Sequence, residues 1–452
     1  MSSPSLGSRL RDILRASRDG NGDRPAPDPS AAGPATTGAA LAAAAAHALG
    51  GEILQTGAGP CVRVVRTYAP DYLHGILRLG ACLDDLEGGE AALPLLTGGT
   101  GPGPGSTDSR ALLFVDIETT GLAGGAGTYA FLVGCARFDG SALVVEQFFM
   151  VGHALECALL SVLRAPIESS GTLVSYNGKT FDVPVLETRF LFHRQAPPFA
   201  GRPHIDMLHT ARRLWRGTRS VVPAPGTQTG SCALAAMEQA LFGLRRYGDV
   251  PGFEIPARFF AFLRSSDARP LQPVFEHNRL DLVSLAALTA RALRLVREAP
   301  ERVDDARECY GVGRLFDGRE DGERAERWYE RAVALSEHSW QADDGLVRVQ
   351  ALRELALRRR RQGRYAEAAT YWEAIVAARA CPPSIMREAL EALAVHFEHR
   401  ARDLGRARRY AERSRLVSHA IARGAAVEHR LARLRRKLVN SGARLVEDAE
   451  GL

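Results

Sequence analysis

The chain has 452 residues, of which 46% are hydrophobic and 24% charged, enough for two to four folded domains and unlike a chain that is disordered throughout. No apolar run is long enough to span a bilayer, and the N-terminus lacks the apolar core of a signal peptide. The seven cysteines are scattered and form no CxxC pair, which argues against a disulfide framework or a zinc knuckle and predicts a cytoplasmic protein.

The formal net charge of +6 is concentrated near the C-terminus, where residues 351–452 contain 22 Lys and Arg against 12 Asp and Glu. A basic balance is weak evidence for a nucleic-acid partner. Arginines that point all around a helix fit an exposed, solubilising surface equally well.

The first 110 residues contain two segments with linker composition. Residues 1–38 are predicted to be a disordered, basic N-terminal segment, and residues 96–110 a Gly/Pro linker. Between them, residues 39–95 mix an Ala-rich helical stretch with strand-like pieces. They predict either a small α+β module or an extension of the following domain.

Residues 111–295 carry the strongest strand signals. ALLFVDIE is an apolar run that ends in carboxylates, and TYAFLVGCARF and ALVVEQFFMV follow as further strands. Helix-like stretches then alternate with a strand at TLVSYN. The pattern predicts an α/β domain, a sheet with covering helices.

Residues 296–440 are predicted to be helical throughout, followed by a tail at 441–452. Two groups share the i, i+4, i+7 spacing of one helix face: Ala325, Tyr329 and Ala332, and Ala368, Trp372 and Ile375. QGRYAEAATYW, with a turn at Gly363 and a helix from Tyr365, resembles a tetratricopeptide repeat. An ordinary helical bundle is the alternative.

Two carboxylates end the first strand of the α/β domain. Residues i and i+2 of a strand point to the same face, so Asp116 and Glu118 project together. Two adjacent carboxylates in an apolar setting are costly unless a cation neutralises them. Oxygen ligands of this kind suit Mg²⁺ or Mn²⁺.

Two later segments add acidic groups and a histidine. A strand ends at Tyr176, a turn follows at Asn177, and Asp182 stands near a helix start. Further on, His277 and Asp281 are four residues apart, which places them on one face of a helix. The spacing thus predicts a third carboxylate, and a fourth beside an imidazole.

The order D-x-E, then D, then H-x-x-x-D resembles the DEDD superfamily of 3′→5′ exonucleases on the ribonuclease-H-like fold. YNGKTFDVP, HIDMLH, GSCAL and EHNRLDLVSLAAL narrow the resemblance to the YprB-like branch, whose members often carry tetratricopeptide repeats after the nuclease domain. The resemblance covers residues 111–295 well and the C-terminal helices loosely.

The resemblance implies a mixed sheet with flanking helices, followed by an all-α helical repeat domain. It also implies a two-metal mechanism with two Mg²⁺ or Mn²⁺ ions, in which His277 is the general base and Glu118 holds or orients the attacking water. The implied metal ligands are Asp116, Glu118, Asp182 and Asp281. The residues expected to contact substrate are Thr119, Tyr176, Asn177, Lys179 and Asn278.

Two local assignments stay open. Histidine-type DEDD enzymes separate His and Asp by five positions, whereas four separate them here, as in the tyrosine type. Either His277 takes the tyrosine's place, or it is only nearby and Asn278 faces the site. His204, Asp206 and His209 have metal-like spacing, but support of a helix start by Asp206 is the favoured interpretation.

The leading hypothesis is a metal-dependent 3′→5′ exonuclease that acts on a single-stranded 3′ end of DNA or RNA and uses its helical repeats to bind a protein partner or substrate. One alternative is a scaffold that binds nucleic acid without cutting and recruits proteins through the repeats. A metal-dependent endonuclease is the other.

Overall fold

A computed structural model describes residues 38–97, 108–121, 127–216, 232–319, 321–337, 342–379, 381–417 and 421–450. The chain divides into two compact units. One comprises the residues up to 212 together with 220–297, and the other comprises 213–219 together with the residues from 298 onward. The predicted N-terminal segment up to residue 37, and residues 98–107 of the predicted linker, lie outside the described residues.

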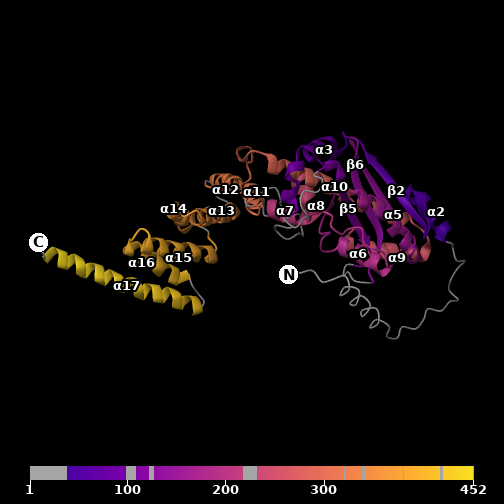
Figure 1. Cartoon of the computed structure of the whole chain (residues 1–452). Helices are drawn as coiled ribbons and strands as arrows, with labels where there is room; N and C mark the ends of the chain where they lie inside the picture. Colours follow the sequence, from indigo (N-terminus) through magenta and orange to yellow (C-terminus); the bar gives the residue numbers. More distant parts are fainter. Residues whose placement is uncertain are drawn as a thin grey trace, which may run out of the picture. The chain divides into compact units, whose positions relative to one another are not determined.

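A seven-stranded mixed sheet forms the frame of the first unit (Figure 1). Strands β5, β8 and β9 run parallel, and the other neighbouring strands run antiparallel. All four strands predicted between residues 111 and 177 are present. In spatial order the strands are β1 (Glu52–Thr56), β2 (Gly59–Tyr68), β7 (Ala142–Phe149), β6 (Ala130–Asp139), β5 (Leu112–Thr119), β8 (Thr172–Ser175) and β9 (His204–Asp206).

Residues 39–95 extend this sheet in the structure instead of standing apart as a small module. Strand β2 pairs with β7 along its length, from Val62 opposite Phe149 to Tyr68 opposite Leu143. The same segment adds a two-stranded ribbon and three helices. These are β3 (Leu73–His74), β4 (Leu77–Arg78), α2 (Gly38–Leu49), α3 (Leu79–Gly88) and α4 (Leu93–Leu96).

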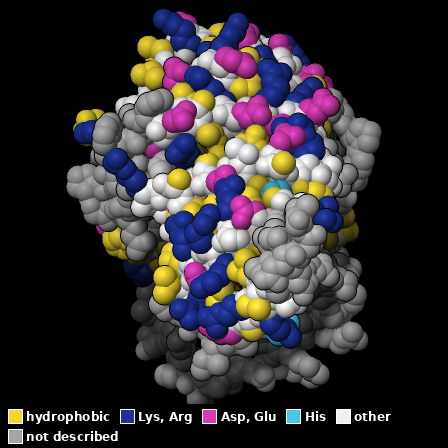
Figure 2. Space-filling view, turned by 90° about the vertical axis from the view of Figure 1, so that its left-hand side faces the viewer, with side chains coloured by type: hydrophobic (Ala, Val, Ile, Leu, Met, Phe, Trp, Pro, Cys, Tyr) yellow, Lys and Arg dark blue, Asp and Glu magenta, His cyan; other side chains and the backbone are white. Residues whose placement is uncertain are grey.

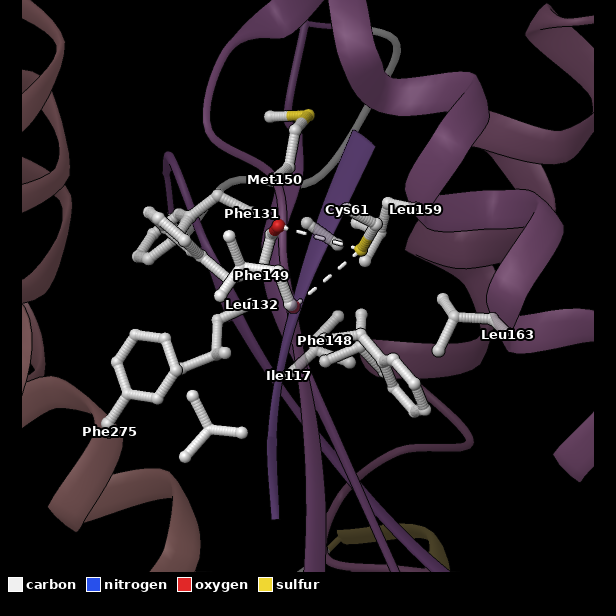
Figure 3. Packing of buried hydrophobic residues seen from close by; sticks show 14 of the residues in the cluster. Cys61, Ile117, Phe131, Leu132, Phe148, Phe149, Met150, Leu159, Leu163 and Phe275 are labelled. Atoms are coloured by element: carbon white, nitrogen blue, oxygen red, sulfur yellow. Dashed lines mark hydrogen bonds between the residues drawn. The ribbon is translucent and has the colours of Figure 1, made fainter. Parts of the chain in front are cut away.

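Helices cover both faces of the sheet, which is why β5 is buried along almost its whole length. The close-up in Figure 3 shows Phe275 of α10 on one side of the strands and Leu159 and Leu163 of α5 on the other. The remaining helices of this unit are α5 (Glu156–Ser169), α6 (Asp182–Phe192), α7 (Met207–Leu214), α8 (Leu234–Phe242), α9 (Ile255–Ser265) and α10 (Gln272–Arg297).

An aromatic cluster fixes α9 and α10 against the sheet. Phe131 of β6 stacks on Phe259 of α9 with 4.2 Å between ring centroids, and Phe149 of β7 lies 5.5 Å from Phe275 of α10. Full burial of each such side chain stabilises the fold by roughly 1.5–3 kcal/mol. This packing holds the polar first half of α10 beside the end of β5.

The second unit is entirely helical in its described residues, and each helix packs against the next along the chain (Figure 1). Its helices are α11 (Ala306–Asp317), α12 (Gly322–Ser336), α13 (Ala342–Arg361), α14 (Tyr365–Ala377), α15 (Pro383–His399), α16 (Leu404–Val417) and α17 (Ile421–Glu450). Helix α17 includes residues 441–450, where a tail was predicted.

The buried helix faces of the second unit agree with the predicted spacing. The two predicted triplets, at 325, 329 and 332 and at 368, 372 and 375, are all buried. Gly363 has a φ of +75° at the turn before α14, and α14 begins at Tyr365. A mixed sheet with flanking helices, followed by an all-α part, is therefore confirmed as the fold class. No helix in the described ranges is long and apolar enough to cross a membrane.

Candidate active site

Strand β5 carries the first two carboxylates of the candidate site. Asp116 and Glu118 alternate with Ile117, whose side chain packs into the core, so both acidic side chains lie on the face covered by α10. The register with β6 shifts between Glu118 and Thr119, at the end of β5, and such irregularities change the direction of side chains. Glu118 is buried, and Asp116 is partly buried.

A tight turn after β8 positions the third carboxylate. Asn177 adopts a φ of +68°, and a Cβ added at Gly178 would lie 2.3 Å from Ser175 Oγ. Only glycine fits at position 178 without displacing the strand end. The turn leads directly into α6, whose first residue is the buried Asp182.

Helix α10 supplies the remaining groups. The fully buried Asn278 donates its amide N–H to Asp116 Oδ2 at 2.8 Å and accepts one from Gln147 Nε2 at 2.8 Å. His277 Nε2 lies 3.7 Å from Asp281 Oδ2. His277 therefore stands beside Asp281, and Asn278 holds Asp116 through a hydrogen bond.

Gly134 of β6 allows α10 to approach the sheet at this point. It is directly opposite Asp116 in the strand register. A Cβ at this position would lie 2.3 Å from Asn278 Oδ1 and 2.6 Å from Leu282 Cδ1. A side chain here would push α10, and with it the site, away from β5.

The four carboxylates act on one another electrostatically. Burial raises the pKa of Asp116 well above its ordinary value, and the charges of Asp281, Glu118 and Asp182 raise it further. Burial is also the main reason that the pKa of Glu118 rises to about 8 and that of Asp182 to about 7. The pKa of Asp281 is likewise raised, chiefly by burial. The sequence-predicted acids thus lie within electrostatic reach of one another, and the neighbouring cations Arg246 and His277 offset the effect of burial on their pKa values only in part.

His277 is held by a residue that sequence analysis did not single out. Asp249 Oδ1 lies 2.7 Å from His277 Nδ1. A carboxylate only accepts hydrogen bonds, so Nδ1 carries the proton and the lone pair of a neutral ring is on Nε2. Burial alone would lower the pKa of His277, but the hydrogen bond to Asp249 and the charges of Asp281 and Glu118 raise it to about 9.

Arg246 is a second residue that the motifs did not reveal. Its guanidinium is almost fully buried, donates to Asp281, and donates through Nε to Glu238 Oε2 at 2.9 Å. It also lies 3.3 Å from Asp249. Both Arg246 and Asp249 belong to the segment between α8 and α9, which has no periodic pattern, so only a spatial contact could have identified them.

The donor set suits divalent cations in charge and ligand type. Four carboxylates with raised pKa values come together, and the cation nearest to Asp281 is the guanidinium of Arg246. In the part of the chain that the structure describes, no three His, Cys, Asp or Glu side chains are close enough to hold a metal ion as they stand. The carboxylates therefore fit such an ion chemically and would have to draw together around it.

Most of the residues expected to contact substrate make hydrogen bonds within the protein. The Thr119 hydroxyl donates to Gly121 O at 2.7 Å, and the Tyr176 hydroxyl donates to the carbonyl of Cys232. Lys179 Nζ lies 3.4 Å from Thr97 O, and Asn177 is exposed at the turn. Asn278 is buried beneath the carboxylates.

Asp206 has the supporting role that the favoured interpretation predicts. Its Oδ1 accepts from the backbone N–H of Leu208 in the first turn of α7 and from that of Asn177, while Oδ2 accepts from Lys179 N. His204 instead contacts Ser175 Oγ at 2.7 Å. Asp206 thereby ties the turn before Asp182 to the helix that follows β9.

Comparison with known proteins identifies the family to which the sequence is similar. Residues 113–293 match the family model of the RNase_H superfamily. The chain is 30% identical, over 329 residues, to the uncharacterized protein YprB of Bacillus subtilis (strain 168), and the match covers 72% of this chain and 75% of that protein. The first match confirms the predicted ribonuclease-H-like domain, and the second confirms the predicted similarity to YprB.

Proposed function

Since this chain belongs to the family of YprB and contains a domain of the RNase_H superfamily, we propose that it is a metal-dependent 3′→5′ exonuclease. The observation that carries the proposal is the mutual electrostatic interaction of Asp116, Glu118, Asp182 and Asp281 beside His277. Buried carboxylates of raised pKa cost stability, so their assembly fits a cation-binding task.

Two Mg²⁺ or Mn²⁺ ions held by these four carboxylates would supply an activated water and stabilise the charge on the scissile phosphate. Glu118 would hold or orient the attacking water, because it is the carboxylate that shares the face of Asp116 and interacts with His277. Hydrolysis of the terminal phosphodiester then releases a nucleoside monophosphate and leaves a new 3′ hydroxyl.

His277 would accept the proton of the attacking water at Nε2, the nitrogen that Asp249 leaves free for this purpose. Its pKa of about 9 arises in part from the charges of Asp281 and Glu118. When cations neutralise these carboxylates, that contribution is cancelled, and Nε2 becomes able to accept a proton near neutral pH.

Residues around the turn after β8 would hold the 3′ end of the strand. Lys179 and the exposed Asn177 offer donors for a phosphate. Tyr176, directly after β8, would offer a ring face to a base, and Thr119, which follows Glu118, would offer a hydroxyl. Asn278 would orient Asp116 through its hydrogen bond to that carboxylate.

The helical unit would bind a protein partner or more of the substrate. A hollow of about 450 Å³ is lined by residues of α11, α13 and α15, among them Tyr310, Arg353 and Glu388. Many basic side chains of this unit are already paired, such as Arg358 with Asp317 and Arg433 with Glu398. Accordingly, Figure 2 shows Lys and Arg side chains interspersed with Asp and Glu side chains on the face drawn.

The decisive experiment incubates the full chain with end-labelled single strands of DNA and RNA of matched sequence, with EDTA, Mg²⁺ or Mn²⁺. We expect stepwise, cation-dependent shortening from the 3′ end. Asp116→Asn and Asp281→Asn should each abolish it, whereas Asp267→Asn, at a partly exposed aspartate before α10, should retain it as a matched control. Activity that persists in Asp116→Asn would refute the assignment.

Two further outcomes distinguish the alternatives. Cation-dependent cleavage of a circular single strand would identify an endonuclease. Tight cation-dependent binding of the labelled strands without any shortening would identify a binding scaffold, in which the same carboxylates would bind nucleic acid through cations without cleaving it.

A further inference from the structure

A cysteine, a histidine and a glutamate on α5 and α6 make a chain of contacts that hydrolysis does not require. Cys157 Sγ lies 3.0 Å from His193 Nδ1, and His193 Nε2 lies 2.6 Å from Glu156 Oε2. Glu156 and Cys157 open α5, whereas His193 directly follows the last residue of α6. The α5 side of the sheet is opposite the α10 side on which Asp116 lies.

The partners of Glu156 fix the orientation of the histidine ring. Arg189 is fully buried and donates to both oxygens of Glu156, at 2.6 Å through Nε and 2.5 Å through Nη2. The Arg189 guanidinium is itself held over the Tyr129 ring at 4.2 Å. A carboxylate in this position accepts the Nε2–H of His193, which leaves the Nδ1 lone pair aimed at the thiol.

Cys157 is placed where a thiol can react. It is one of two partly exposed cysteines among those described, the other being Cys381, while the remaining five are buried. As the second residue of α5 it lies at the positive end of a 14-residue helix, whose dipole stabilises the negative charge that develops on sulfur as the thiol reacts. Burial, together with the Glu156 charge, raises the pKa of Cys157. The resting thiol thus keeps its proton and needs an acceptor when it reacts.

From this geometry we propose that Cys157, His193 and Glu156 form a reactive-thiol site, at which Cys157 undergoes thiol–disulfide exchange with small disulfides. The Cys157 sulfur attacks one sulfur of the disulfide, a new S–S bond forms and the original S–S bond breaks. His193 Nδ1 takes the thiol proton and passes it to the departing thiolate, which leaves as a thiol. Cys157 is oxidised to a mixed disulfide while the departing half is reduced.

The test treats the native full chain with 2,2′-dithiodipyridine and follows modification of each cysteine by peptide mass spectrometry. Cys381 is the internal control, because burial raises its pKa as well and its described hydrogen bond is to the carbonyl of Pro382. We expect Cys157 to react at least about tenfold faster than Cys381. His193→Gln should remove this advantage and leave the rate at Cys381 unchanged.

Equal rates at Cys157 and Cys381 in the native wild type would overturn the proposal, as would a His193→Gln rate equal to that of the wild type at Cys157. Should His193→Gln fail to fold, the wild type in guanidinium chloride provides the second measurement. Unfolding separates the thiol from its histidine, so the proposal requires the two rates to converge there, and a persistent advantage of Cys157 would contradict it.

Discussion

Replacement of Glu118 by glutamine should stabilise the metal-free protein even as it removes a carboxylate that the proposed hydrolysis would use. The carboxyl of Glu118 is buried, and its pKa rises from an ordinary 4.5 to about 8, first because of burial. A raised carboxyl pKa means that stability is present below pH 4.5 and is lost as the pH rises to about 8. Glutamine has nearly the same shape as glutamate and carries no charge, so the variant does not lose stability as the pH rises.

The size of the effect follows from the same pKa. A carboxyl that must ionise against a pKa near 8 instead of 4.5 costs about 5 kcal/mol of folding free energy at pH above 8. Neighbouring carboxyls can take up a proton in its place, so we expect Glu118→Gln to gain about 2–4 kcal/mol at pH 8.5 and close to nothing at pH 4.5.

Native-state hydrogen exchange of peptides covering β5, measured with EDTA at both pH values, reports the opening free energy of this unit directly. Mn²⁺ should reduce the difference in opening free energy between Glu118→Gln and the wild type at pH 8.5, because it stabilises the wild type more than the variant. The matched control is Glu156→Gln, which strips the buried Arg189 of its charged partner and should destabilise at either pH. A Glu118→Gln protein no more stable than wild type at pH 8.5 would refute the electrostatic reasoning.

Three other changes test separate parts of the structure. Asp249→Asn should lower kcat of the cation-loaded protein about tenfold or more with little change in KM, since an amide no longer fixes the proton on Nδ1 of His277. An unchanged kcat in steady-state kinetics would contradict this role of Asp249. Gly134→Ala should cost about 1–3 kcal/mol in denaturant unfolding, because the new methyl collides with Asn278, and wild-type stability would contradict the packing argument. Burial alone would raise the pKa of Glu398, but its basic partners lower it to about 2. The stability of the helical unit should therefore fall as the pH drops from 4.5 toward 2. In thermal unfolding, Glu398→Gln should weaken this dependence of stability on pH.

Local periodicity was sufficient to predict much of the molecule. Alternation along one strand places Asp116 and Glu118 on the same face, and a separation of four residues places His277 beside Asp281 on α10. The helix start at Tyr365 and the buried face around Trp372 were predicted in the same way. Each of these depends on residues within one or two turns, where chain geometry fixes relative positions.

Contacts between distant segments were decided only by tertiary packing. Nothing in the local pattern of residues 39–95 shows that β2 pairs with β7, because an exposed strand edge accepts any compatible partner. Asp249 reaches His277 from a segment without periodicity, and Cys157 meets His193 across 36 residues of sequence. Such pairs form because two elements are pressed together by their apolar faces, a condition that depends on the whole core and is absent from any short stretch of sequence.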